Sequence, residues 1–172
     1  MSETHTRLCP SIPRLPRSLP AALRLALVLT VFWACNAAAE AVDPEDINPD
    51  KPFAQAHIIL QVSDGDATRH STVLSIASNL IKHYGGEDQV DIEIIAFAGG
   101  VSMLRGGDNP NAARIRSLQA TGVRFYICGN TLDTIAYRTG KRPAVFPGVE
   151  EVPVGVAFLV GEMARGYQPV HP

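Results

Sequence analysis

The sequence predicts a single α/β domain with a mainly parallel β-sheet of four to five strands. Short apolar runs rich in Val and Ile, which suit buried strands, recur along the chain. Segments with apolar residues at helical spacing follow most of these runs. The chain has 172 residues, which is the usual length of one domain. Alternating strands and helices imply right-handed βαβ connections and a sheet covered by helices on both faces.

Composition excludes some classes of partner. The formal net charge is -2, whereas a nucleic-acid-binding surface normally carries a basic face or stripe. Hydrophobic residues make up 46% of the chain and aromatic residues only 6%. We therefore expect no nucleic-acid partner, and a core made mainly of Val, Ile, Leu and Ala.

The start of the chain has the pattern of a secretory signal peptide. A basic segment precedes the uncharged apolar run 25–35, and small alanines follow it. We expect residues 1–39 to be the signal peptide, 40–55 a flexible acidic Pro-rich linker, and 56–172 the folded domain. This predicts a periplasmic protein, which would contact the membrane only if the leader stayed uncleaved as an N-terminal anchor.

The first predicted strand covers residues 57–62, which read HIILQV, and the polar residues 63–66 form the turn after it. A helix follows, because apolar residues between 73 and 81 recur at helical spacing. Gly85 and its neighbour Gly86 are expected to end that helix.

The second predicted strand covers residues 90–98, and Gly99 and Gly100 interrupt it. A short turn or half-helix follows these two glycines. The next helix is expected to use Asn109 as its N-cap and Pro110 as its first helical residue.

The third predicted strand covers residues 123–128, and Asn130 with Asp133 resembles a capping box for the helix after it. A fourth strand is expected at 151–154, followed by another amphipathic helix. Residues 167–172 can add a terminal edge strand.

Cys128 is the main candidate for chemistry. Cys9 and Cys35 would leave with the signal peptide, so Cys128 would be the single thiol of the mature protein. It lies where a strand leads into a helix, and the free N–H groups and positive dipole at a helix N-terminus favour a thiolate. Two alternatives remain open, an inert buried cysteine and an intermolecular disulfide.

A ligand site is expected around this cysteine, because ligands of open α/β sheets bind at the carboxyl ends of the strands. The candidate ligand-binding residues in the loops at that edge are Gly99, Gly100, Gly129, Asn130 and Thr131. The histidines lack metal-ligand spacing and no phosphate-binding loop occurs, so the sequence predicts neither a metal site nor a cofactor.

Three segments resemble one known family. Residues 123–132 read VRFYICGNTL, residues 92–106 read IEIIAFAGGVSMLRG, and residues 153–172 read PVGVAFLVGEMARGYQPVHP. They are similar to the DsrE/DsrF-like family of sulfur-relay and sulfur-oxidation proteins, over roughly residues 56–172. The resemblance implies a three-layer α/β/α fold, homo-oligomers such as trimers or hexamers, and a persulfide accepted at Cys128 from a sulfur donor protein or passed to an acceptor.

The sequence therefore predicts an exported sulfur-handling protein, either a persulfide carrier or a sulfurtransferase-type protein, that acts through Cys128. The alternative is a non-catalytic module of the same fold that binds a small ligand or a partner protein. A third possibility is a redox role in which Cys128 forms an intermolecular disulfide.

Overall fold

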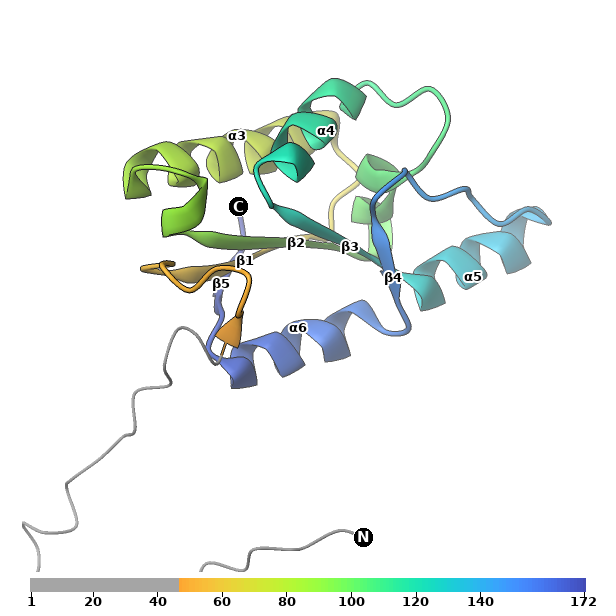
Figure 1. The fold of residues 1–172 in the computed structure, drawn as a ribbon. Helices are drawn as coiled ribbons and strands as arrows, with labels where there is room; N and C mark the ends of the chain where they lie inside the picture. The colour runs from red at the N-terminus through yellow and green to blue at the C-terminus, as the bar shows by residue number, and fades with distance from the viewer. Residues whose placement is uncertain (1–46) are drawn as a thin grey trace, which may run out of the picture. The chain divides into compact units, whose positions relative to one another are not determined.

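The computed structural model describes residues 47–172, which form a five-stranded parallel sheet with strand order β4-β3-β2-β1-β5 (Figure 1). All four strand pairings are parallel, with His57 opposite Asp91 at the start of the β1–β2 pair. The predicted α/β class with a parallel sheet is confirmed. The strands are β1 (His57–Val62), β2 (Asp91–Ala96), β3 (Arg124–Cys128), β4 (Glu150–Val152) and β5 (Gln168–Val170).

Helices cover both faces of the sheet, so the fold has three layers. The helices are α3 (Ala67–Tyr84), α4 (Ala112–Ala120), α5 (Gly129–Thr139) and α6 (Gly155–Arg165), with the 3-10 segments η1 (Glu87–Gln89) and η2 (Ala98–Leu104). Figure 1 shows α3 and α4 on one face and α6 on the other, and α5 leaves the carboxyl end of β3. None of the helices among residues 47–172 is both long enough and apolar enough to cross a membrane.

The two faces of the sheet, called here the α3 face and the α6 face, bury different side chains. The α3 face is an apolar core whose completely buried members include Leu60, Leu74, Ile94, Ile115 and Ile127. The α6 face has a smaller apolar cluster that includes Ile59, Ile95, Tyr126, Leu159 and Tyr167. The rest of the α6 face is polar, as described below.

Helix α3 begins earlier than the apolar stripe alone indicates. The side chain of Asp66 accepts hydrogen bonds from the backbone N–H groups of Thr68 (2.8 Å) and Arg69 (3.0 Å). These bonds, that of Arg69 first, hold the pKa of Asp66 below its usual value. Gly85 ends the helix in the left-handed conformation with φ +91, as the sequence predicts.

The predicted start of α4 is wrong by two residues. Asn109 does not cap the helix, because its side chain is used in the preceding loop. Its amide Nδ2 donates to the carbonyl oxygens of Met103 and Arg105, at 2.9 Å each, and its Oδ1 accepts from the backbone of Asn111. The helix therefore begins only after this loop has closed.

The predicted capping box of α5 is also wrong. The helix starts at Gly129, its N-cap residue is Cys128, and the side chains of Asn130 and Asp133 do not cap it. Asn130 already lies inside the first turn, where its N–H donates to the carbonyl oxygen of Pro153 at 3.0 Å. The thiol of Cys128 therefore takes the place next to the free N–H groups that a capping oxygen would normally occupy.

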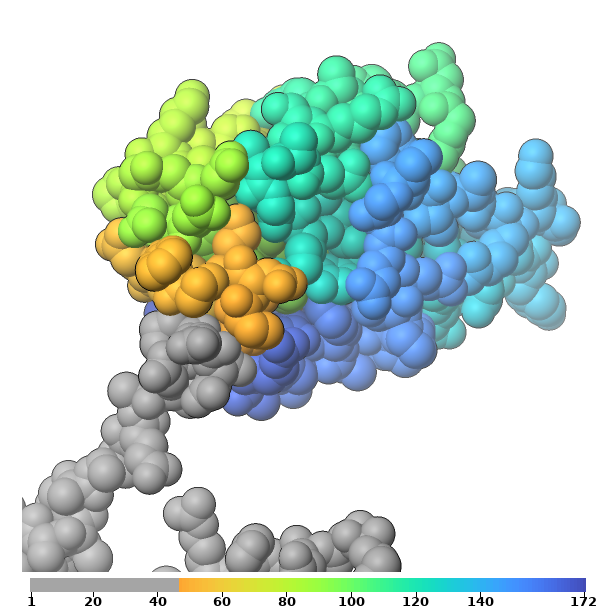
Figure 2. Space-filling view, viewed as in Figure 1, coloured from red at the N-terminus to blue at the C-terminus, as the bar shows by residue number. Residues whose placement is uncertain are grey.

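The prediction of a flexible linker over residues 40–55 is wrong for residues 47–55. Ile47 and Ala54 are 6% and 3% exposed, and the side chain of Asn48 donates to Asp91 at 2.9 Å. Lys51 reaches the carbonyl oxygen of Glu87 at 2.6 Å. Figure 2 shows this stretch, at the start of the orange surface, lying against the rest of the domain. The signal-peptide prediction and residues 40–46 lie outside the described part of the chain.

Candidate functional site

Cys128 lies between the N-termini of two helices. It is the last residue of β3 and the N-cap of α5. Its sulfur also accepts a hydrogen bond from the backbone N–H of Gly155, at 3.3 Å, and Gly155 is the first residue of α6. Two positive helix ends therefore meet at one sulfur, and both favour negative charge there.

The thiol is buried but its surroundings favour the thiolate. The residue is 5% exposed, and burial alone raises the pKa of Cys128. Hydrogen bonding by the Thr131 hydroxyl, and then by the N–H groups of Gly155 and Thr131, outweighs burial, so that the net pKa of Cys128 lies below its usual value. Donors that bond to the charged form produce this direction of shift.

Glycine at position 155 lets α6 approach the sulfur closely. A Cβ atom there would lie 3.0 Å from the Cβ of Cys128 and 3.2 Å from the Cβ of Phe97. Any larger residue would push the helix end away from the thiol. Sequence reasoning did not connect Gly155 to Cys128, although Gly155 falls in the segment 153–172 that resembles the family.

A groove of about 490 Å³ lies between η2 and α5, next to the thiol. Three of the predicted ligand-binding residues line it, namely Gly99, Asn130 and Thr131. The hydroxyl oxygen of Thr131 accepts the N–H of Ala98 at 3.2 Å, which ties the two elements together at one end of the groove. We call this cavity the η2–α5 groove.

Ala98 has an unusual backbone conformation at this point. Its φ is +47, and it is the single non-glycine residue with positive φ among residues 47–172. This conformation is uncommon for an alanine, and residues held in it cluster at functional sites. The hydrogen bond to Thr131 holds Ala98 in place at the start of η2.

The other two predicted glycines lie outside the groove. Gly100 is buried, and a Cβ atom there would lie 2.0 Å from the carbonyl oxygen of Val62, so its small size is a packing requirement. Gly129 lines a separate depression on the β4 side, where a Cβ atom would lie 2.6 Å from Oε1 of Glu151. The structure thus brings Gly99, Asn130 and Thr131 together and separates Gly100 and Gly129 from them.

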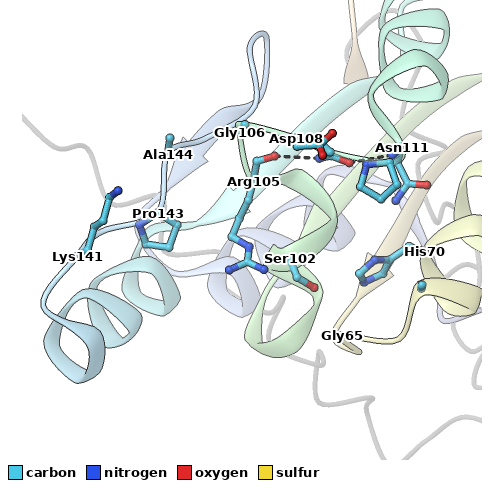
Figure 3. Close-up of a pocket in the computed structure, with 14 residues that line it drawn as sticks. Gly65, His70, Ser102, Arg105, Gly106, Asp108, Asn111, Lys141, Pro143 and Ala144 are labelled. Carbon is cyan, nitrogen blue, oxygen red and sulfur yellow. Dashed lines mark hydrogen bonds between the residues drawn. The ribbon is translucent and has the colours of Figure 1, made fainter.

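A second cavity, of about 600 Å³, adjoins the groove (Figure 3). His70 lines it, with its Nε2 atom 2.8 Å from the carbonyl oxygen of Asp64. Ser102 and Arg105 line both cavities, so they form the wall between them. Sequence reasoning missed these two residues, because neither belongs to a recognised motif.

Buried charges occupy the amino end of the sheet on the α6 face. Asp91 is completely buried and receives hydrogen bonds from Asn48, Arg124 (3.1 Å) and Tyr167, with Nδ1 of His57 at 3.2 Å. Burial raises the pKa of Asp91, but these bonds, that of Tyr167 first, keep it below its usual value.

Glu93 lies on the same face of the sheet, two residues further along β2. Burial and then the nearby charge of Glu162 raise the pKa of Glu93 to about 7, although Arg124 donates to it at 3.0 Å. Burial also raises the pKa of Tyr126, whose hydroxyl lies 3.4 Å from Glu93, to about 12. We call Asp91, Glu93, Arg124 and their partners the charged cluster.

No group of three His, Cys, Asp or Glu side chains within residues 47–172 has the arrangement of a metal site. The charged cluster is no exception, because Arg124 lies between its two carboxylates.

Comparison with known proteins gives a fold but no function. No family model and no curated protein sequence matches the chain. One solved structure that resembles it is MTH1491 from Methanobacterium thermoautotrophicum, a protein of unknown function. The TM-score is 0.60 at 26% sequence identity, over 69% of this chain and 100% of that one.

Proposed function

We propose that this protein handles sulfur, with Cys128 as the thiolate that accepts a sulfur atom. The observation that carries the proposal is the convergence of two helix N-termini on the sulfur, with the Gly155 N–H at 3.3 Å. Because only the thiolate is a strong nucleophile, a depressed pKa prepares Cys128 for attack. The resemblance to the DsrE/DsrF-like family supports the same residue and the same chemistry.

The proposed step needs no external oxidant or reductant. The Cys128 thiolate attacks the terminal sulfur of a donor persulfide R–S–SH, and a new S–S bond forms at Cys128. The S–S bond of the donor breaks, and R–S⁻ leaves with its electron pair. The donor N–H groups of Gly155 and Thr131 hold negative charge on Cys128 before the attack.

Burial of the thiol favours this role over the redox alternative. At 5% exposure, the sulfur cannot meet a second protein's cysteine without local opening. A small donor, or a narrow segment of a donor protein, needs less opening.

Intact-mass measurement after incubation with a small persulfide donor tests the proposal. We expect the wild-type protein to gain one sulfur atom and Cys128→Ser to gain none. Gly155→Ala serves as a matched variant, because it keeps the thiol but displaces the α6 N–H group, and we expect slower sulfur uptake from it. No sulfur on the wild type, or equal sulfur on Cys128→Ser, would refute the proposal.

We also propose, from the resemblance and the leader pattern, that the protein is exported to the periplasm and forms homo-oligomers. Fractionation of cells expressing the full chain tests the location. Light scattering on the purified protein tests the oligomeric state, and a monomer at all concentrations would count against a trimer or hexamer.

A second candidate function is the binding of a small ligand without chemistry at Cys128. The η2–α5 groove supports it, because Gly99, Asn130 and Thr131 line a cavity of ordinary ligand size. If Cys128→Ser preserved the biological role of the protein, this second function would replace the first.

A further inference from the structure

The guanidinium groups of two arginines have no partner among residues 47–172. Residues 47–172 contain eight arginines. Six of them bond to carboxylates, hydroxyls or carbonyls, or lie over an aromatic ring: Arg69, Arg114, Arg116, Arg124, Arg142 and Arg165. The remaining two, Arg105 and Arg138, make no such contact with the described residues, and both line the η2–α5 groove.

The groove around them carries no opposing charge. Among the described residues no Asp or Glu lines it, so the two guanidinium groups give its walls a charge of about two. Both arginines are exposed and line the same groove of about 490 Å³. An anion that entered the groove would therefore meet two cations and no carboxylate.

The two arginines line the groove from different elements. Thr131, Thr134 and Arg138 line the groove from α5 at helical spacing, so they share one face of that helix. Ser102 and Arg105 line it from the opposite wall. Figure 3 shows the Arg105 side chain projecting toward the 3-10 segment that carries Ser102. Arg138 thus lies about 10 Å along α5 from Thr131.

We propose that Arg105 and Arg138 bind a tetrahedral dianion, the phosphate or thiosulfate class of oxyanion, in the η2–α5 groove. Guanidinium forks match the oxygens of such groups, and a dianion neutralises both charges at once. A monoanion would leave one arginine uncompensated. This inference rests on the groove being a ligand site, as in the second candidate function, and does not require Cys128 to react.

Titration of the full-length protein with inorganic phosphate, thiosulfate and glycerol 3-phosphate tests the inference, with backbone amide shifts as the readout. We expect saturable shifts in η2 and α5, and an affinity at least about tenfold lower in the double variant Arg105→Ala/Arg138→Ala. Lys82→Ala is the matched control, since it removes an exposed charge on α3 away from the groove. It should bind like the wild type.

Two further variants separate this inference from simpler explanations. Arg138 also lies in the last turn of α5, where a cation stabilises the helix dipole. Arg138→Lys keeps that charge but loses the paired N–H donors of the guanidinium group. Weaker anion binding with unchanged thermal stability in this variant supports the inference. Equal affinity in the wild type and the folded double variant overturns it.

Cys128→Ser distinguishes this inference from the proposed sulfur chemistry. We expect it to bind the anions as the wild type does, because the sulfur does not line the groove. Anion binding without sulfur uptake by the wild type would refute only the thiol chemistry. Sulfur uptake with no anion binding would refute only the dianion site. Tighter binding of glycerol 3-phosphate than of inorganic phosphate would identify an ester as the ligand.

Discussion

The two faces of the sheet use the same strands in different ways. On the α3 face, Leu60, Ile94 and Ile127 pack against Leu74 and other apolar residues, all completely buried. On the α6 face, the neighbouring positions of the same strands carry Asp91, Glu93, Arg124 and Cys128. One face therefore supplies apolar packing and the other holds the groups that can carry charge.

Within the α6 face, the charged cluster and the thiol lie at opposite ends of β3. Arg124, Tyr126 and Cys128 occupy every second position of that strand and so share one face. Tyr126, in the middle, belongs to the apolar cluster of the α6 face. Charges at the amino end depend on mutual pairing, because buried charges without partners are costly. The thiol at the carboxyl end depends on backbone N–H groups instead.

The largest effect expected is the loss of stability in Arg124→Met. Arg124 donates to Asp91 and Glu93 at 3.1 and 3.0 Å, and removing it takes away the cation that lies between these two buried carboxylates. We expect a loss of about 3–4 kcal/mol in the free energy of unfolding, measured by urea denaturation. A loss below about 1 kcal/mol would show that the charged cluster does not depend on this arginine.

The matching change on the other face is Leu74→Ala. Leu74 is 0% exposed in the apolar core, so truncation removes its burial and leaves a cavity. We expect a loss of about 3 kcal/mol that is the same at pH 5 as at pH 8, because no titrating group is involved. A cost that changed strongly with pH would remove the distinction between the two faces.

A smaller change in the free energy of unfolding is expected from the titration of Glu93. The pKa of Glu93 is about 7 in the folded protein, above the ordinary value of 4.5. Between pH 4.5 and 7, Glu93 therefore keeps its proton in the folded protein but loses it in the unfolded chain. Stability should therefore fall, by about 2 kcal/mol, as pH rises from 4.5 to 7. Glu93→Gln should flatten this slope, and a wild-type curve that rises over this window would contradict the prediction.

The smallest effect expected is that of Thr131→Val on the thiol. The Thr131 hydroxyl is the largest of the groups that lower the pKa of Cys128, and valine removes it while nearly preserving the volume. We expect the thiol pKa to rise, because one donor to the thiolate is lost, with thiolate absorbance against pH as the measurement. Thr134→Ser, in the same helix, is the control and should leave the titration unchanged.

Several features could be predicted from the sequence because they depend on local patterns. Alternating apolar runs and helical stripes predicted the βα order, and all five strands form where short apolar or terminal segments were expected. Cys128 was expected between strand and helix, and it is both the end of β3 and the N-cap of α5. The periodicity of a strand or a helix depends on residues close together in the chain, so it can be recognised in the sequence alone.

The remaining features depend on residues far apart in the chain. Asp91 and Glu93 look like the polar side of a half-exposed strand, yet they are buried because Arg124 and Tyr167 come from 33 and 76 residues away. The N–H of Gly155 that reaches Cys128 is 27 residues distant. Segment 47–55 has the composition of a linker, but Asn48 within it bonds to Asp91 of β2. Local patterns predict which elements form, but only tertiary packing decides which polar groups face each other, because those pairings depend on how the elements meet in space.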